Sequence, residues 1–308
     1  YEEQHSLEME YISFIGWRPK TIDLKYITIQ KPYNTRYSTG QRLSKSTWFF
    51  GGSSIWGYGL SDEGTIPSIY ARKSNLPVYN FGEQAWSSRQ SLNQLVNVIG
   101  DGYKPEVVIF YSGVNDVSVG CSAYNEIIPI PVHQYQHTLS RLLKEDGQII
   151  NSKKIIKILI EPYSRIGAKL FKKGSKNKKE SRYNCPSNNA KSNTIASHLV
   201  NNWYSAYLIS KANKAKFIAV LQPYNNYYGN YQKLPIPLNL EQIKSYEKVY
   251  PLIIKEINKK CLIDQSFCSS FVDGSKWINS NSNYFIDDCH LTEKGNEIIA
   301  NWLIKTIK

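Results

Sequence analysis

Acidic residues and long hydrophobic runs are both scarce in this sequence. The 308 residues include 25 Asp and Glu against 38 Lys and Arg, which leaves a formal net charge of +13. The longest apolar runs, such as residues 107–111 and 217–221, fall far short of the ~20 residues that a membrane-spanning helix needs, so we expect no membrane span. The hydrophobic fraction of 41% excludes a disordered chain, because burying that much apolar surface offsets the entropy lost on folding.

Cysteines are few, and their spacing is not that of metal ligands. The sequence has no CxxC pair and no cluster of Cys and His, which argues against a zinc site. An odd number of cysteines leaves at least one thiol unpaired, and the others either form disulfides or stay free, as in a cytosolic enzyme. Cys261 and Cys268 are nearest in sequence and could close a short loop. Cys185 has no evident partner from spacing alone. Cys121 and Cys289 flank the motifs described below and could meet in space.

The positive charge has three interpretations: the protein binds nucleic acid, it acts on an anionic surface or polysaccharide, or it comes from an organism whose proteins are generally rich in lysine. We expect no nucleic-acid partner, because the sequence lacks zinc-finger spacing, a heptad-linked basic region and an RNP-like strand. Much of the excess lies within residues 169–182. A run of this kind is usually a solvated loop. The alternative is that it contacts an anionic polymer through its lysines, which are Lys172, Lys173, Lys176, Lys178 and Lys179.

Short apolar runs that end in turn signals alternate with helical stretches. The β-prone runs are residues 46–50, 77–81, 107–111 and 217–221. Apolar residues recur with helical spacing over residues 65–73, 88–99, 134–143 and 195–207. Wholly apolar strands separated by helices are typical of an α/β fold with a parallel sheet covered on both faces. In such sheets the reactive groups lie at the carboxyl ends of the strands.

The remaining segments suggest how the chain is organised. Residues 1–45 are polar and predict an N-terminal extended arm with a short strand or two, followed by one domain over residues 46–308. Within it, residues 151–189 predict a basic insertion, in which residues 155–160 fit either a strand or a helix. Thr292 is placed to cap a last helix that runs through Ile307.

Polar residues with chemical potential follow three of the strands and precede the last helix. Ser53 follows two glycines at the first strand end, and Gly82 offers an unobstructed N–H after the second. Asn115 follows the third, where its carboxamide can donate to a developing oxyanion. Asp287 stands three residues before His290, close enough to bind the imidazole and hold its tautomer. Each is an ordinary turn or surface feature alone, but their joint order is hard to attribute to chance.

As a set, these blocks resemble those of the SGNH hydrolases, also called the GDSL esterase/lipase family. Ser53, Gly82, Asn115 and His290 match the family in type, order and approximate spacing, and Asp287 matches its Asp-x-x-His. The resemblance runs from about residue 48 to the C-terminus. One position departs from it: the family's usual Gly-Asp-Ser is here Gly-Gly-Ser.

The resemblance implies a three-layer α/β/α sandwich with a central parallel sheet, a flavodoxin-like arrangement, and ester chemistry without a metal or organic cofactor. Ser53 would be the nucleophile, His290 its base, and Asp287 the group that orients the imidazole, with Asp288 as the fallback. The implied oxyanion hole consists of the backbone N–H groups of Ser53 and Gly82 and the side-chain amide of Asn115. Ser53 and His290 are so far apart in sequence that nearly the whole chain must fold as one domain.

These features predict a serine esterase that removes a small acyl group, expected to be acetyl, from a carbohydrate or cell-envelope polymer. An O-acetyltransferase on the same triad and a non-catalytic polysaccharide-binding module are the alternatives. Aromatic residues near the motifs, Trp56, Tyr58, Trp86 and Tyr111, would either stack on sugar rings or pack in the core. We expect an extracytoplasmic site, periplasmic or at the cell surface, because disulfides suit it and because a chain that starts at Tyr1 fits an anchored or secreted precursor.

Overall fold

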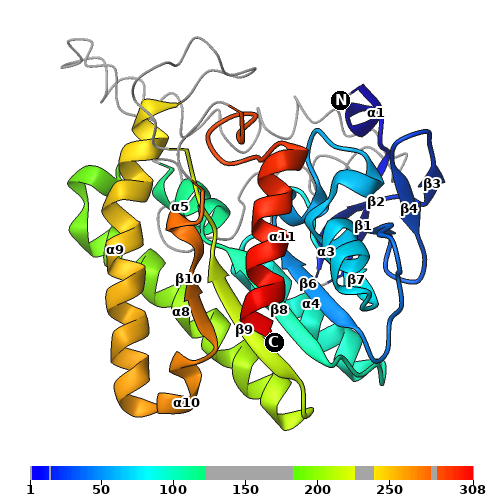
Figure 1. Ribbon diagram of the computed structural model, residues 1–308. Helices are drawn as coiled ribbons and strands as arrows, with labels where there is room; N and C mark the ends of the chain where they lie inside the picture. The colour runs from blue at the N-terminus through cyan, green and yellow to red at the C-terminus, as the bar shows by residue number, and fades with distance from the viewer. Residues whose placement is uncertain (1, 14, 123–182, 226–238, 279–282, 308) are drawn as a thin grey trace, which may run out of the picture.

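Five parallel strands form the central sheet. The computed structural model describes residues 2–13, 15–122, 183–225, 239–278 and 283–307, and the strand order in its sheet is β10-β9-β8-β6-β7. All neighbouring pairs are parallel, which confirms the predicted sheet type. The strands are β6 (Thr47–Gly51), β7 (Val78–Asn80), β8 (Val107–Ser112), β9 (Lys216–Leu221) and β10 (Phe271–Asp273) (Figure 1).

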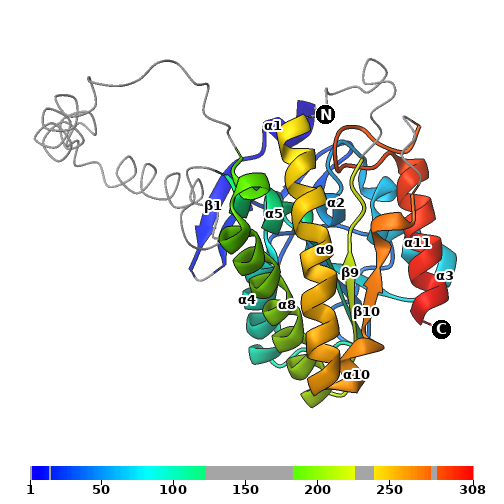
Figure 2. The ribbon, with the colours of Figure 1, turned by 90° about the vertical axis from the view of Figure 1, so that its left-hand side faces the viewer.

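Strand side chains alternate between two hydrophobic cores, one on each face of the sheet. In β6, Trp48 and Phe50 pack into the first core, whereas Phe49 packs into the second. Helices α4, α5, α8 and α9 cover the first core, and α3 and α11 cover the second (Figure 2). The protein is therefore the three-layer α/β/α sandwich that the resemblance implied.

Side chains cap the first turns of helices α3 and α4. Thr65 accepts a hydrogen bond from the Ser68 N–H at the start of α3, and Ser87 and Gln90 form a capping box at the start of α4. The α-helices that surround the sheet are α2 (Ser53–Trp56), α3 (Ile66–Ser74), α4 (Ser88–Gly100), α5 (Val114–Cys121), α8 (Asn189–Ala212), α9 (Leu240–Ile263), α10 (Gln265–Cys268) and α11 (Glu293–Ile307). The 3₁₀ turns are η1 (Asp62–Gly64), η2 (Cys185–Ser187) and η4 (Gly274–Lys276). No helix of the described ranges is long and apolar enough to span a membrane.

Most of the predicted elements that fall on described residues are confirmed. The helices expected over residues 65–73, 88–99 and 195–207 correspond to α3, α4 and α8, and the capped last helix corresponds to α11. Helices α5 and α9 and strand β10 were not predicted. The helix expected over residues 134–143, the ambiguous residues 155–160 and the five lysines of the basic run lie outside the described residues.

The N-terminal arm contains more structure than the sequence predicted. After α1 (Glu2–His5), it forms an antiparallel pair of strands and then a three-stranded antiparallel sheet. These strands are β1 (Met9–Ile12), β2 (Gly16–Pro19), β3 (Ile22–Asp23), β4 (Thr28–Gln30) and β5 (Thr35–Arg36). Two arginines of this arm, Arg18 and Arg36, are fully buried, so the arm packs against the domain rather than extending away from it.

Two disulfides join four of the cysteines. One joins Cys261 to Cys268, as their spacing suggested, and the other joins Cys121 to Cys185. The expectation that Cys121 and Cys289 meet is therefore wrong. Cys121 ends α5 beside η2, where its carbonyl accepts a hydrogen bond from the Asn184 N–H (2.9 Å), and Cys289 keeps a free, buried thiol.

Candidate active site

A continuous chain of hydrogen bonds joins Ser53, His290 and Asp287. The Ser53 Oγ lies 2.6 Å from the His290 Nε2, and the His290 Nδ1 lies 2.6 Å from the Asp287 Oδ2. The serine and the histidine are 237 positions apart in sequence. The structure thus brings together the three side chains that the sequence nominated as nucleophile, base and orienting acid, in an arrangement that lets a proton pass from the serine hydroxyl to the imidazole.

The sheet and the last helix hold the two ends of this chain. Ser53 is the first residue of α2, directly after β6, so it lies at the carboxyl edge of the sheet. His290 lies in the loop before α11, where its carbonyl accepts a hydrogen bond from the Ile286 N–H (2.7 Å). This bond closes a tight loop whose turn points Asp287 back toward the imidazole.

Of the two adjacent carboxylates, Asp287 is the one that binds the imidazole. Its Oδ1 accepts hydrogen bonds from the backbone N–H groups of Cys289 (2.9 Å) and His290 (2.7 Å). Burial raises the pKa of Asp287, but its hydrogen bonds and the charge of His290 outweigh burial, so the pKa lies below its ordinary value. Asp288 instead accepts a hydrogen bond from the Tyr246 hydroxyl (3.1 Å), and burial raises its pKa to about 6. The fallback role for Asp288 is not supported.

Asn115 lies beside the serine turn at the start of α5. Its Nδ2 donates to the Trp86 carbonyl (2.9 Å), and this bond uses one of its two amide hydrogens. A Cβ built on Gly52 would lie 2.2 Å from the same nitrogen. The carboxamide therefore packs directly against the backbone that precedes Ser53.

The Gly82 N–H already has an acceptor within the chain. It donates to the Asn80 Oδ1 (2.9 Å), and a Cβ at Gly82 would meet the Trp56 nitrogen at 2.6 Å. Gly82 thus lies beneath α2 and is a glycine because of that close approach. The prediction that its N–H is free to bind a substrate oxygen is not borne out.

A model of the GDSL-like lipase/acylhydrolase family matches residues 48–303. The chain belongs to this family. No curated protein matches it by sequence.

Three solved structures that resemble this GDSL-like hydrolase are distant from it in sequence. A protein of Bacteroides fragilis described as an acylhydrolase is 16% identical, with 86% of this chain and 90% of that chain covered and a TM-score of 0.45. A GDSL-like lipase of Bacteroides thetaiotaomicron is 15% identical, with coverages of 86% and 89% and a TM-score of 0.44. An acetyl xylan esterase is 12% identical, with coverages of 85% and 99% and a TM-score of 0.45.

Three of the four aromatic residues near the motifs of this hydrolase belong to its core. Trp56, Trp86 and Tyr111 are fully buried. Tyr58 alone reaches the imidazole, with its ring stacked on that of His290 at a centroid distance of 4.3 Å. The structure thus gives three of them the packing role and leaves Tyr58 as an aromatic contact to the proposed base.

Buried charges surround the loop that carries Trp86. The Arg18 guanidinium lies 4.3 Å from the centroid of the Trp86 ring and 3.4 Å from the Glu83 carboxylate. Burial lowers the pKa of Arg18 to about 10 and raises that of Glu83 to about 7. Asp116 is also buried; it accepts hydrogen bonds from the N–H and hydroxyl of Ser88 and thereby braces the start of α4.

One group of described residues has the composition of a metal site, and it overlaps the hydrogen-bonded chain. Ligand atoms of Asp287, Cys289 and His290 lie within 4.8 Å of one another. Burial raises the pKa of the Cys289 thiol well above its ordinary value, which opposes the thiolate that a metal would need. A metal here would also have to replace the bond between Asp287 and His290.

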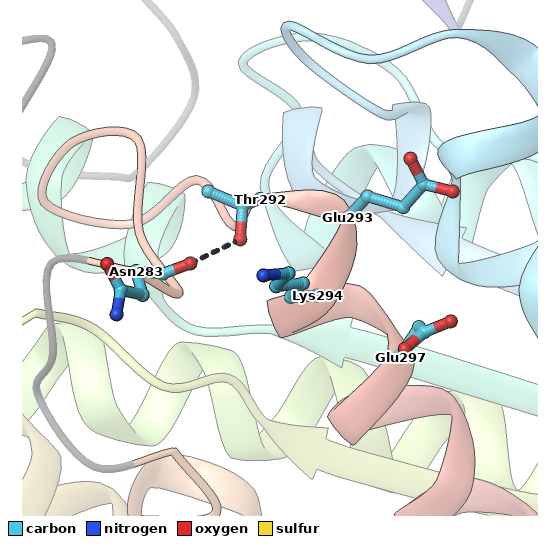
Figure 3. A pocket seen from close by; sticks show the side chains of 5 residues that line it. All are labelled: Asn283, Thr292, Glu293, Lys294 and Glu297. Atoms are coloured by element: carbon cyan, nitrogen blue, oxygen red, sulfur yellow. Dashed lines mark hydrogen bonds between the residues drawn. The ribbon is translucent and has the colours of Figure 1, made fainter.

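An open cavity of about 650 Å³ lies where α11 begins, and none of Ser53, His290 and Asp287 is among the residues that line it. Two of its lining residues are joined by a hydrogen bond from the Thr292 hydroxyl to the Asn283 carbonyl (2.8 Å), and three charged side chains complete the lining (Figure 3). These are Glu293, Lys294 and Glu297.

Proposed function

We propose that the protein is a serine esterase that hydrolyses a small acyl ester, with acetyl as the leading candidate, on a carbohydrate or cell-envelope polymer. The observation that carries the proposal is the unbroken chain from the Ser53 Oγ through His290 to Asp287, with 2.6 Å at both links. Membership of the GDSL-like family supports a hydrolase, and the chain of hydrogen bonds supports a serine nucleophile.

Catalysis would proceed through an acyl-enzyme. The Ser53 Oγ attacks the ester carbonyl carbon while the His290 Nε2 takes its proton, and the imidazolium then returns that proton to the departing alcohol oxygen. Water, deprotonated by the same nitrogen, attacks the acyl group and releases the acid, and Ser53 regains its proton. Asp287 stabilises the imidazolium in both steps because its negative charge lies against the Nδ1–H.

The oxyanion would be held by two donors. No backbone acceptor among the described residues binds the Ser53 N–H, which is the first of α2, and the second amide hydrogen of Asn115 is left over after the bond to Trp86. Donors of this kind are typically worth ~10²–10³ each in rate. Because Gly82 gives its N–H to Asn80, it has no part in this proposal.

The nature of the substrate is inferred from hydrophobicity and charge. The apolar runs of the sequence are short, and no long apolar lid is evident in it, which favours a small acyl group over a long acyl chain. The net charge of +13 favours an anionic polymer, which the lysines of residues 169–182 would contact. The two disulfides support an extracytoplasmic location, since such bridges persist in oxidising compartments.

Hydrolysis of aryl esters tests the proposal. We expect turnover of an aryl acetate to exceed that of an aryl octanoate, Ser53→Ala to lose at least ~10³-fold in kcat, and a fluorophosphonate to label Ser53. Exposed Ser6→Ala is the matched control and should keep full activity. Labelling that survives in Ser53→Ala, or no labelling of the folded wild type, would reject the nucleophile.

A second measurement defines the acceptor. Incubation with an acetylated oligosaccharide should release acetate. If acetylated sugar forms instead as the dominant product when an aryl acetate and a free oligosaccharide are mixed, the enzyme is an O-acetyltransferase. If acetylated sugar is bound but neither product forms, the protein is a polysaccharide-binding module.

A further inference from the structure

Arg36 of the N-terminal arm lies fully buried behind the serine turn, and each of its N–H groups has an acceptor. Its Nε donates to the Asp62 Oδ1 (2.8 Å) and one terminal nitrogen donates to the Trp56 and Gly57 carbonyls (3.1 and 2.6 Å). The other terminal nitrogen donates to the Leu60 and Tyr26 carbonyls (2.6 and 3.3 Å). An arginine has five donors, so this side chain is completely satisfied.

The acceptors of Arg36 include the end of the helix that begins with Ser53. Helix α2 has only four residues, and a helix of one turn is not stable by itself. Its last carbonyls have no partner within the helix, and a cation at that end compensates both the missing bonds and the dipole. Arg36 supplies this cation to Trp56 and Gly57, and its guanidinium also stacks on the Trp56 ring at 4.5 Å.

A direct path leads from Arg36 to the serine. The Gly57 and Tyr58 N–H groups both donate to the Ser53 carbonyl (2.8 and 3.0 Å), so the segment that Arg36 holds is hydrogen-bonded to Ser53 itself. Gly57 has a φ of +95°, and a Cβ there would lie 2.4 Å from the Thr65 Cγ2 and 3.0 Å from a terminal nitrogen of Arg36. The sharp turn after α2 is therefore closely packed against both Thr65 and the guanidinium.

We propose that Arg36 is a positioning residue that holds the Ser53 Oγ in place against His290, so that the N-terminal arm is part of the active-site frame. The arm precedes the matched residues 48–303, and the family match alone does not assign it a role. The inference deepens the proposed esterase function and rests on it. Lysine cannot replace Arg36, because an ammonium has three donors, whereas the guanidinium donates to five acceptors.

The test compares Arg36→Lys and Arg36→Met with a variant that is destabilised elsewhere. Leu303→Ala removes a fully buried side chain near the end of α11, far along the chain from α2, and should lower Tm by a comparable amount. All variants are assayed as full-length protein at a temperature where circular dichroism shows them folded.

We expect the rate of fluorophosphonate labelling and kcat on an aryl acetate to fall ~10- to 100-fold in both Arg36 variants, with KM changed less than ~3-fold. Leu303→Ala should label within ~2-fold of wild type. Wild-type labelling in folded Arg36→Met, or an equal loss in Leu303→Ala, would overturn the positioning role.

An activity-independent readout separates this inference from the proposed function. The ¹⁵N chemical shift of the His290 Nε2 reports its hydrogen bond to Ser53, whether or not any ester is hydrolysed. It should change in Arg36→Met and stay unchanged in Leu303→Ala. An unchanged shift in Arg36→Met rejects the inference, whereas a wild type that is never labelled rejects only the esterase function.

Discussion

The Asn115 side chain packs so closely against Gly52 that no side chain fits there: a Cβ on Gly52 would lie 2.2 Å from the Asn115 Nδ2, far inside contact distance. The Trp86 carbonyl, which binds that nitrogen, would lie 3.3 Å from the same Cβ. This position is where the chain departs from the usual Gly-Asp-Ser of its family. The departure has a physical reason here, because the carboxamide fills the room that a side chain would need.

Restoring the family's acid should therefore damage the site. We expect Gly52→Asp and Gly52→Ala to lower kcat at least ~10²-fold by displacing Asn115, about the loss expected for one oxyanion donor. Gly100→Ala is the control, because a Cβ there meets nothing within 4 Å. In an Asn115→Ala background, Gly52→Ala should cost much less than it does alone; full additivity would contradict the steric explanation.

The two adjacent carboxylates should respond differently to neutralisation. We expect Asp287→Asn to lower kcat ~10⁴-fold, because an amide disfavours the tautomer that accepts the Ser53 proton. Asp288→Asn should stay within ~5-fold of wild type, since Asp288 binds the Tyr246 hydroxyl. Steady-state kinetics on an aryl acetate decide it, and similar losses in both variants would refute the assignment.

Asp116 should make the free energy of unfolding depend on pH. Burial raises its pKa from 3.8 to about 6, so between about pH 4 and pH 6 the native state binds more protons than the unfolded state. Stability gained from Asp116 at low pH is then lost as pH rises through this window. The free energy of unfolding of wild type should therefore fall between pH 4 and pH 7 by about 1–3 kcal/mol more than that of Asp116→Asn, as measured by urea titration. A difference that does not vary with pH would count against the raised pKa.

The disulfide between Cys121 and Cys185 should contribute strongly to stability. It closes a loop with a sequence separation of 64, and the chain-entropy argument gives about 4 kcal/mol for a loop of that length. Cys121→Ser/Cys185→Ser should therefore lower Tm more than Cys261→Ser/Cys268→Ser, whose separation is 7. Mass spectrometry of the alkylated wild type should find one free thiol, at Cys289. A second free thiol would disprove the pairing.

The sequence determined the site through local patterns. Apolar strand runs that end in turn signals and alternate with helical stretches predicted the parallel sheet. Ser53 and Asn115 follow the carboxyl ends of β6 and β8, as expected. Asp287 and His290 could be paired because they are three residues apart. Helix α9 was not predicted, because Pro251 and the mixed polar residues obscured the apolar stripe of Ile243, Tyr246, Val249 and Ile253.

Only the tertiary structure decided which groups meet across long separations. The sequence could not show that the Asn80 side chain takes the Gly82 N–H, that Asp288 turns to Tyr246, or that Cys121 pairs with Cys185. The polar composition of the N-terminal arm predicts that it is exposed to solvent, because Lys and Arg are rarely buried without partners. Arg36 is buried all the same, since four of its five acceptors come from residues 20 or more positions away and exist as a set only in the folded chain.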